Sequence, residues 1–158
     1  MVQDEGQSDD PLEQAIADFV VIAFYFLLRV GEYTCPSGSK RTQTVQFRRC
    51  DVTFWKMLPC GIHHQINPLA TLNEFASADS VTPTLSNQKN GVRDATLNHE
   101  AVPGPFCPVK TLARRYVASR QTQQDNKYAL LCNYAPQKVL TAKHIYQILQ
   151  RAAFRTTI

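Results

Sequence analysis

The chain has 158 residues, of which 44% are hydrophobic and 19% are charged, and its formal net charge is +4. This length favours one domain, and the hydrophobic fraction can build a core, which excludes an intrinsically disordered chain. Five of the thirteen acids lie in the first thirteen residues, so the remainder holds seventeen bases against eight acids, a formal +9. A basic body favours a polyanionic partner such as nucleic acid, although a basic surface can also serve solubility alone.

The five cysteines are irregularly spaced and include no Cys-x-x-Cys pair. They indicate reduced thiols in an intracellular protein. Cys60, His63 and His64 lack a second pair at zinc spacing, so we expect no metal site and no cofactor. The acidic, polar start does not read as a signal peptide, and the apolar run 19–28 is shorter than the ~20 residues that span a bilayer. We therefore expect no membrane association.

Residues 1–10 are predicted to be a disordered lead, and residues 11–158 to form the domain. Asp10 and Pro11 open a helix, with Glu13 completing a capping box. Apolar residues then recur at helical spacing and cover much of the circumference, which indicates a central helix. They are Ile16, Phe19, Val20, Ala23, Phe26, Leu27 and Val30.

The most informative stretch closes this run, where Arg29, Gly31 and Glu32 follow ten largely apolar residues. Gly31 predicts a break or bend, because glycine tolerates a positive φ. A guanidinium beside such a run needs an anion or a carboxylate, and Glu32 lies near enough to orient it. The alternative is an ordinary arginine that extends from a helix C-terminus into solvent.

The middle of the chain contains the strand signals. Residues 44–55 are predicted to be a strand with a bulge or turn near Cys50 and Asp51. Residues 69–75 could form a short helix. Residues 81–97 form the clearest hairpin, since Asn90-Gly91 is the strongest two-residue turn signal. Pro83 predicts that its first strand is an edge strand or a bulged strand.

Two helices are predicted in the last third of the chain. Pro108 opens the first, whose apolar face includes Leu112 and Tyr116. Thr141 caps the second. Its inward residues are predicted to be Ile145, Ile148, Leu149 and Ala152. The expected fold class is therefore α+β and mainly helical, with a small antiparallel sheet.

The order in which several of these features occur along the chain is informative. Leu27-Leu28-Arg29-x-x-Glu32 ends the apolar helix, a basic strand covers 45–52, Lys89 precedes the Asn-Gly turn, and Cys107-Pro108 opens a helix rich in arginine. From about residue 15 to about residue 154, this order resembles the catalytic domain of the tyrosine recombinases, the phage-integrase family. It looks most like the versions in mobile elements of eukaryotic genomes.

The resemblance implies roles for individual residues. Arg29 matches the family's first active-site arginine, Glu32 the acidic residue that follows it, and Lys89 the hairpin lysine, with Arg93 as a rival cation. The family cleaves a DNA phosphodiester with a tyrosine and no metal, so cationic donors must neutralise the charge on phosphorus. The lysine would protonate the leaving oxygen.

The same resemblance implies double-stranded DNA as the partner, and a nuclear location if the host is eukaryotic. Basic residues expected to contact DNA are Lys40, Arg41, Arg48, Arg49 and Arg93. A homo-oligomer is expected only of an intact, full-length form.

The chain departs from the family pattern in two ways. No histidine is followed three residues later by arginine, and all six tyrosines lie too early to be the nucleophile. We therefore expect a truncated or decayed catalytic domain that does not cut DNA. A non-enzymatic DNA-binding or regulatory module derived from an integrase, and a small basic interaction domain without a nucleic-acid role, remain as alternatives.

Overall fold

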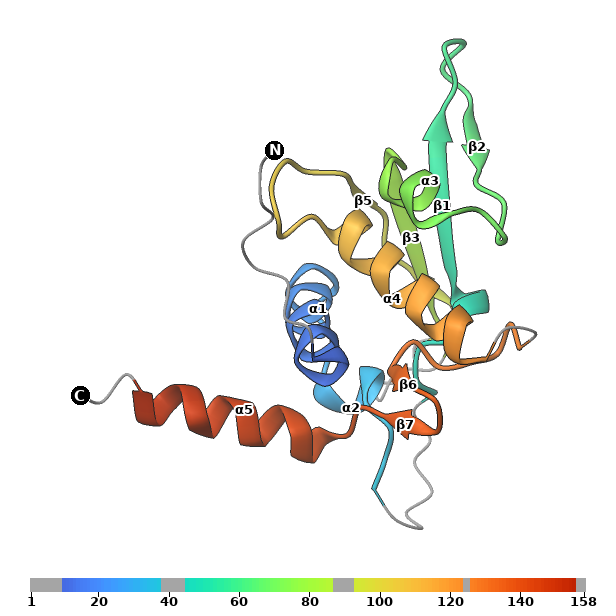
Figure 1. Ribbon diagram of the computed structural model, residues 1–158. Coiled ribbons are helices and arrows are strands. Elements are labelled where there is room, and N and C mark those ends of the chain that lie inside the picture. Colours follow the sequence, from blue (N-terminus) through green and yellow to red (C-terminus); the bar gives the residue numbers. More distant parts are fainter. Residues whose placement is uncertain (1–9, 38–44, 87–92, 124–125, 156–158) are drawn as a thin grey trace.

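The computed structural model describes residues 10–37, 45–86, 93–123 and 126–155 (Figure 1). Within them the chain is an α+β domain in which helices hold more residues than strands, so the predicted class is confirmed at this level. In chain order the elements are α1 (Pro11–Phe26), α2 (Val30–Tyr33), the 3-10 helix η1 (Arg49–Asp51), β1 (Val52–Met57), β2 (His63–Gln65), α3 (Leu72–Ala76), β3 (Ser80–Leu85), β4 (Ala95–Thr96), β5 (His99–Glu100), α4 (Pro108–Thr122), β6 (Asn133–Ala135), β7 (Lys138–Val139) and α5 (Ala142–Arg155).

Local sequence signals fix the starts of α1 and α4 as predicted. The Asp10 carboxylate accepts a hydrogen bond from the Leu12 N–H at 2.9 Å, and Pro11 occupies the first turn of α1. Pro108 likewise occupies the first turn of α4. The Thr71 hydroxyl caps α3. The predicted lead falls on residues that the structure does not describe, apart from Asp10.

The core lies between α1, α4 and the sheet, and α4 contacts every layer around it (Figure 1). Phe54 of β1, Phe75 of α3 and Tyr116 of α4 meet with ring centroids 4.7–5.7 Å apart. Aromatic side chains bury large apolar areas, so this cluster fixes the sheet and α3 onto one side of α4. Phe19 and Phe26 cover another side from α1.

The prediction that α1 continues to Val30 as a central helix is wrong in two respects. The helix ends at Phe26, because Leu27 adopts the left-handed conformation with φ 53°. One of its faces also remains at the surface, where Val20 is 52% exposed and Phe24 is 76% exposed. Apolar content alone cannot show which face is covered.

The sheet has the strand order β2-β1-β3-β4, and β5 also pairs with β3. The hairpin is confirmed in its ladder, because Thr84 pairs with Thr96 and Leu85 with Ala95. Its turn lies outside the described residues. Strand β3 is central. Of the two alternatives based on Pro83, an edge strand or a bulged strand, the edge strand is therefore wrong.

A central position suits this proline because the ladder is interrupted beside it. Strand β5 pairs with Ser80 and Val81, whereas β4 pairs with Thr84 and Leu85. The Pro83 carbonyl accepts a 3.3 Å bond from the Leu97 N–H on that side. The N–H that proline lacks would point to the same side, into the gap between β4 and β5.

The strand predicted for residues 44–55 is two pieces joined by a turn. Around Arg48 the chain pairs with Leu130, then η1 turns it into β1. Of the bulge or turn predicted near Cys50 and Asp51, the turn is confirmed. In one regular strand, Phe47 and Phe54 would face opposite sides of the sheet. The turn lets both side chains reach the core.

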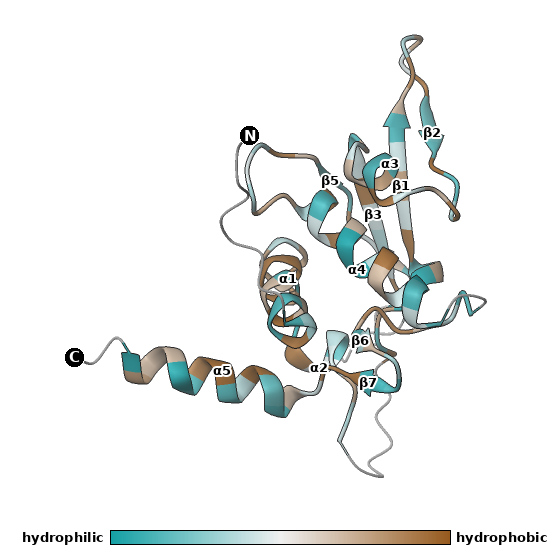
Figure 2. Cartoon of the chain, in the orientation of Figure 1, coloured by the Kyte–Doolittle hydropathy of each residue, from teal (hydrophilic) through white to brown (hydrophobic). Residues whose placement is uncertain are grey.

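Helix α5 extends away from the body (Figure 1). Ile145 is buried and Ile148 is half-buried, as predicted. Leu149 is 55% exposed and Ala152 is exposed as well, so the prediction that they point inward is wrong. Apolar residues recur along α5 (Figure 2), and Leu149 and Phe154 among them are exposed. None of the helices in the described part of the chain has the length and apolar character needed to cross a membrane.

A buried ion cluster joins α1 to α4. Asp18 is 1% exposed, and its carboxylate accepts from Arg114 Nη2 at 2.6 Å and from Arg115 Nε at 2.9 Å. Within the described residues, Arg115 Nη1 is buried without a hydrogen-bond partner. Burial lowers the pKa of Arg115, and the nearby Asp18 carboxylate opposes this effect.

Candidate functional site

Arg29 stands at the surface immediately before α2. It is the N-cap residue, with an extended backbone, and its side chain is exposed. The Arg29 N–H donates to Glu32 Oε2 at 2.8 Å, and the Glu32 N–H donates to the Arg29 carbonyl at 2.8 Å. Glu32, which is 7% exposed, therefore orients the backbone of Arg29. We had expected its carboxylate to orient the guanidinium instead.

The bend that exposes Arg29 is made by Leu27 rather than by Gly31. Leu27 is the left-handed C-cap of α1, and the Leu28 N–H donates to the Ala23 carbonyl at 3.0 Å. Gly31 lies inside α2, and a Cβ added there would meet nothing within 4 Å. Its glycine is therefore not required by backbone geometry, contrary to the prediction.

Arg29 and the base of the predicted hairpin lie along one edge of the molecule. Gln46 Nε2 donates to the Gly31 carbonyl at 3.4 Å, and Arg48 Nη2 donates to Ser86 Oγ at 3.0 Å. Phe47, between them, points into the core. Alternate side chains of an extended segment share a face, and two such residues span about 7 Å. One short segment thus connects α2 to the last described residue before the hairpin turn.

Arg48 is held by a carboxylate at this edge. Its Nε and Nη2 atoms each lie 2.9 Å from an oxygen of Asp51, and Ser86 Oγ contacts the same carboxylate at 3.3 Å. The hydrogen bond to Asp51 raises the pKa of Arg48. A bidentate pair is rigid, so Arg48 is positioned although its charge is largely compensated.

The prediction missed an exposed aromatic side chain beside Arg48. Tyr128 is 56% exposed, with the Arg48 guanidinium 5.8 Å and the Lys127 ammonium 5.1 Å from its ring centroid. Cation–π contacts of this kind stabilise the cations modestly at the surface. The adjacent Lys127-Tyr128 pair in the sequence was the available signal, but nothing local indicated its closeness to Arg48.

Arg49 has a structural position. The residue is 5% exposed, and its guanidinium donates to the backbone carbonyl of Gln123, at 3.0 Å, and to that of Asn126. Gln123 is the C-cap of α4. A cation at a helix C-terminus satisfies carbonyls that have no partner within the helix and interacts favourably with the helix dipole. Arg49 does not lie at the surface as a DNA contact would.

The other predicted site residues are only partly placed. Arg93 is exposed beside Asp94, which has a positive φ of 53°. Lys89 lies outside the described residues, as do Lys40 and Arg41. Whether Lys89 or Arg93 is the hairpin cation is therefore undecided. The closeness of Arg29 to this cation stays a prediction.

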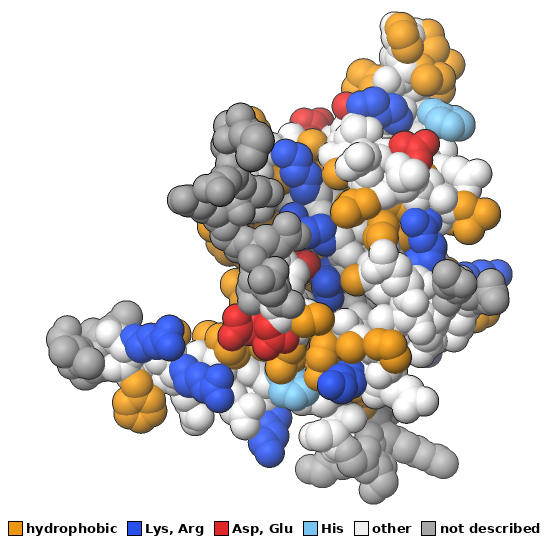
Figure 3. Space-filling model, in the orientation of Figure 1, with side chains coloured by type: hydrophobic (Ala, Val, Ile, Leu, Met, Phe, Trp, Pro, Cys, Tyr) orange, Lys and Arg blue, Asp and Glu red, His pale blue; other side chains and the backbone are white. Residues whose placement is uncertain are grey.

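Basic side chains are spread over the visible face and along α5 (Figure 3). Among the described residues visible in this view, they do not form one continuous patch. Several cations counted toward the +9 are engaged inside the fold, Arg49 and Arg115 among them. Fewer of the seventeen cations can therefore contact a ligand at the surface than the sequence count suggests.

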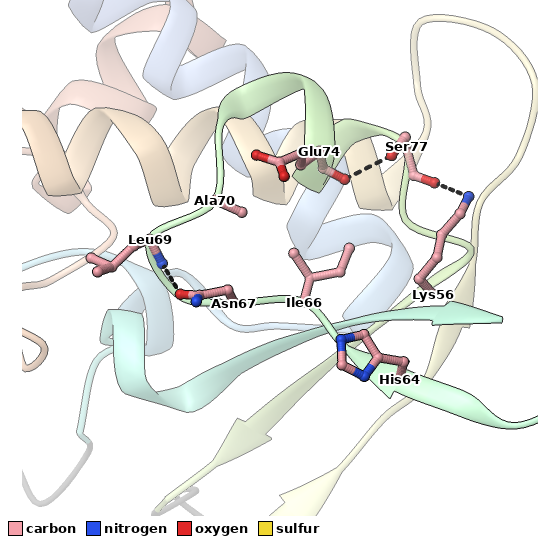
Figure 4. Close-up of a pocket in the computed structure, with 8 residues that line it drawn as sticks. All are labelled: Lys56, His64, Ile66, Asn67, Leu69, Ala70, Glu74 and Ser77. Carbon is pink, nitrogen blue, oxygen red and sulfur yellow. Dashed lines mark hydrogen bonds between the residues drawn. The ribbon is translucent and has the colours of Figure 1, made fainter. Parts of the chain in front are cut away.

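A separate pocket of about 520 Å³ lies between α3 and the segment that follows β2 (Figure 4). Ile66, Leu69 and Ala70 give it an apolar wall, and Lys56 closes one end by donating to the Ser77 carbonyl. Hydrogen bonds from Thr71 keep the pKa of Glu74 below its usual value. This pocket is formed by elements away from Arg29, so it does not belong to the predicted site.

Titratable side chains do not assemble into a metal centre in the parts of the chain that are described. Cys60 and the adjacent histidines are exposed. All five cysteines are unpaired. Burial raises the pKa of the Cys132 thiol to about 12, which makes this thiol a poor nucleophile.

Comparison with known proteins gave no family model, no curated protein and no solved structure that matches this chain.

Proposed function

We propose that this chain is a double-stranded DNA-binding domain of the tyrosine-recombinase catalytic type. The observation that supports it best is the position of Arg29, which is exposed, fixed through its backbone by Glu32, and connected along one edge to the hairpin base. The sequence order of apolar helix, arginine, glutamate, hairpin and arginine-rich helix adds to this support. In a eukaryotic host the protein would be nuclear.

The chemistry of the site follows from its donors. The Arg29 guanidinium can form two parallel hydrogen bonds to the oxygens of one DNA phosphate. A hairpin cation, Lys89 or Arg93, would approach the same phosphate and could protonate a leaving oxygen. Since these 158 residues contain no His-x-x-Arg sequence, we propose that they bind DNA without breaking it.

Binding to a labelled duplex over a series of salt concentrations tests the proposal. We expect weak affinity with little sequence preference, falling as salt rises because each contacted phosphate releases a counterion. Arg29→Ala should reduce the affinity and lower the salt slope by about one. Arg155→Ala is the matched control, since Arg155 is an exposed arginine at the far end of α5 (Figure 1). No binding at low salt would refute the proposal.

The absence of cleavage is tested separately. Incubation with a nicked suicide duplex, followed by a denaturing gel, should give no covalent protein–DNA band. Tyr146, which is 58% exposed, is the last tyrosine in the chain. A covalent band that disappears in Tyr146→Phe would show that the chain is a complete nuclease or recombinase.

A further inference from the structure

The exposed face of α1 has a regular pattern. Glu13, Ala17, Val20, Phe24 and Leu27 follow one another at spacings of 4, 3, 4 and 3 residues, and all are exposed. Alternating spacings of three and four residues align side chains into the narrow stripe by which two helices pair. Ala17, Val20, Phe24 and Leu27 are named the α1 seam below.

The last residue of the seam is strained as well as exposed. Leu27 has φ 53° and is 86% exposed. A bulky side chain is uncommon in the left-handed conformation, for which glycine is the usual C-cap choice. Exposure to water gives no free energy to offset the strain of this leucine. Burial of its side chain against a second helix would offset it.

The chain itself offers little to cover the seam. Its core contacts use the opposite face of α1, through Phe19, Ile22 and Phe26. The segments outside the described ranges are polar, and their only large apolar residues are Met1, Val2, Val92 and Ile158. A helix from another molecule is therefore the better occupant.

We propose that a second copy of this chain covers the seam, with the two α1 helices antiparallel around a twofold axis. In this register Val20 of each copy lies opposite Phe24 of the other. Ala17 lies opposite Leu27 in the same way. Each large side chain thereby meets a smaller one, which is the pairing that close packing requires. An isologous interface of this kind closes on itself as a dimer.

Charge selects the antiparallel arrangement. A parallel pair would place Glu13 beside its own equivalent, where like charges repel. The antiparallel pair brings Glu13 to the end of the other helix, and Arg29 follows that end two residues after Leu27. Both side chains are exposed, although Glu13 also lines a small pocket beside Arg151 of α5 in its own chain. Opposite charges thus flank the apolar seam at both of its ends.

Sedimentation equilibrium of the purified chain tests the proposal without DNA. The seam is small, so we expect a reversible dimer with Kd on the order of micromolar or weaker. Phe24→Glu should raise Kd at least about tenfold, because it places a charge inside the seam. The matched control is Phe106→Glu, which changes a phenylalanine that is 68% exposed elsewhere on the surface. Circular dichroism checks that both variants stay folded.

Disulfide trapping tests the register. With the exposed Cys50 and Cys60 replaced by serine, chains carrying Val20→Cys are mixed with chains carrying Phe24→Cys. Cross-links between the two kinds of chain support the antiparallel pair, whereas links between two Val20→Cys chains indicate a parallel pair and contradict it. A monomer at every concentration would overturn the proposal, as would equal weakening by Phe24→Glu and Phe106→Glu.

Discussion

The arginines between α1 and α4 and the arginine before α2 carry the same charge in opposite surroundings. Arg115 is 4% exposed and shares the Asp18 carboxylate with Arg114. Arg29 is exposed, and the neighbouring carboxylate contacts its backbone instead of its guanidinium. The comparison shows that a basic composition divides into cations that hold the fold and cations that can meet a ligand.

The two groups should respond differently to mutation. Removing one partner of a buried ion pair leaves an uncompensated charge in the interior, which is strongly destabilising. Removing an exposed arginine changes the free energy of unfolding little, within about 0.5 kcal/mol. Stability measurements on one group and DNA-binding measurements on the other would therefore separate them.

The largest expected effect belongs to Asp18. Asp18→Ala should lower the free energy of unfolding by about 3–5 kcal/mol, because Arg115 then has no counter-charge in the interior. Urea denaturation followed by circular dichroism measures it. Glu100→Ala, which removes an exposed carboxylate, is the control and should change stability by less than about 0.5 kcal/mol. Equal effects of the two substitutions would show that the cluster has no stabilising role.

Arg49 provides a second, smaller test. Arg49→Ala removes hydrogen bonds from a charged donor to the end of α4 and should cost about 2 kcal/mol of stability. At a temperature where the variant is folded, its DNA affinity should match that of the parent chain. Arg29→Ala should give the converse result, with parental stability and reduced affinity. A loss of DNA affinity by folded Arg49→Ala would place Arg49 among the ligand-binding cations.

The buried thiol of Cys132 should make the stability of the chain depend on pH. Burial raises the pKa of its thiol from 9.0 to about 12, so the folded chain retains a proton that the unfolded chain loses. Its contribution to stability is complete below pH 9 and is lost as pH rises toward 12. Denaturation under reducing conditions between pH 7 and 10 should show a shallower decline in Cys132→Ala than in the parent or in the exposed-thiol control Cys60→Ala. Identical slopes would contradict this assignment.

The smallest effect is expected at Gly31. Because this glycine is helical and a Cβ there meets nothing within 4 Å, Gly31→Ala should leave the chain unchanged or stabilise it by up to about 1 kcal/mol. Thermal unfolding measures the change. A substantial destabilisation would mean that Gly31 forms part of the bend before Arg29. A glycine with a positive φ, Gly104, is the control and should lose stability on the same change.

Local signals predicted local structure well. The starts of α1 and α4, and the ladder between β3 and β4, follow from a few neighbouring residues each. The central position of β3 could not be predicted from Pro83, since it depends on β1, which pairs with the other side of β3 from about thirty residues earlier in the chain. The exposure of Leu149 on α5 likewise depends on what packs beside it.

The candidate site was predicted to a smaller extent. The sequence indicated that Arg29 and Glu32 act together, but it could not show that the carboxylate contacts the backbone. It treated Arg48 and Arg49 alike, although Arg48 ends an extended segment and Arg49 begins the 3-10 helix η1. Arg48 consequently reaches the surface edge, whereas Arg49 is buried against α4. The contact of Tyr128 with Arg48 joins residues eighty positions apart and has no local signal.

The cluster that joins Asp18 to Arg114 and Arg115 spans almost one hundred residues of sequence. During synthesis from the N-terminus, α1 emerges long before α4 exists, so its core face has only the nearby Tyr33 of α2 to pack against until most of the chain is made. Closing so long a loop has an entropic cost that must be met before the contact forms. Docking of α1 should therefore be a late step of folding, and Asp18→Asn should accelerate unfolding more than it slows refolding in stopped-flow measurements.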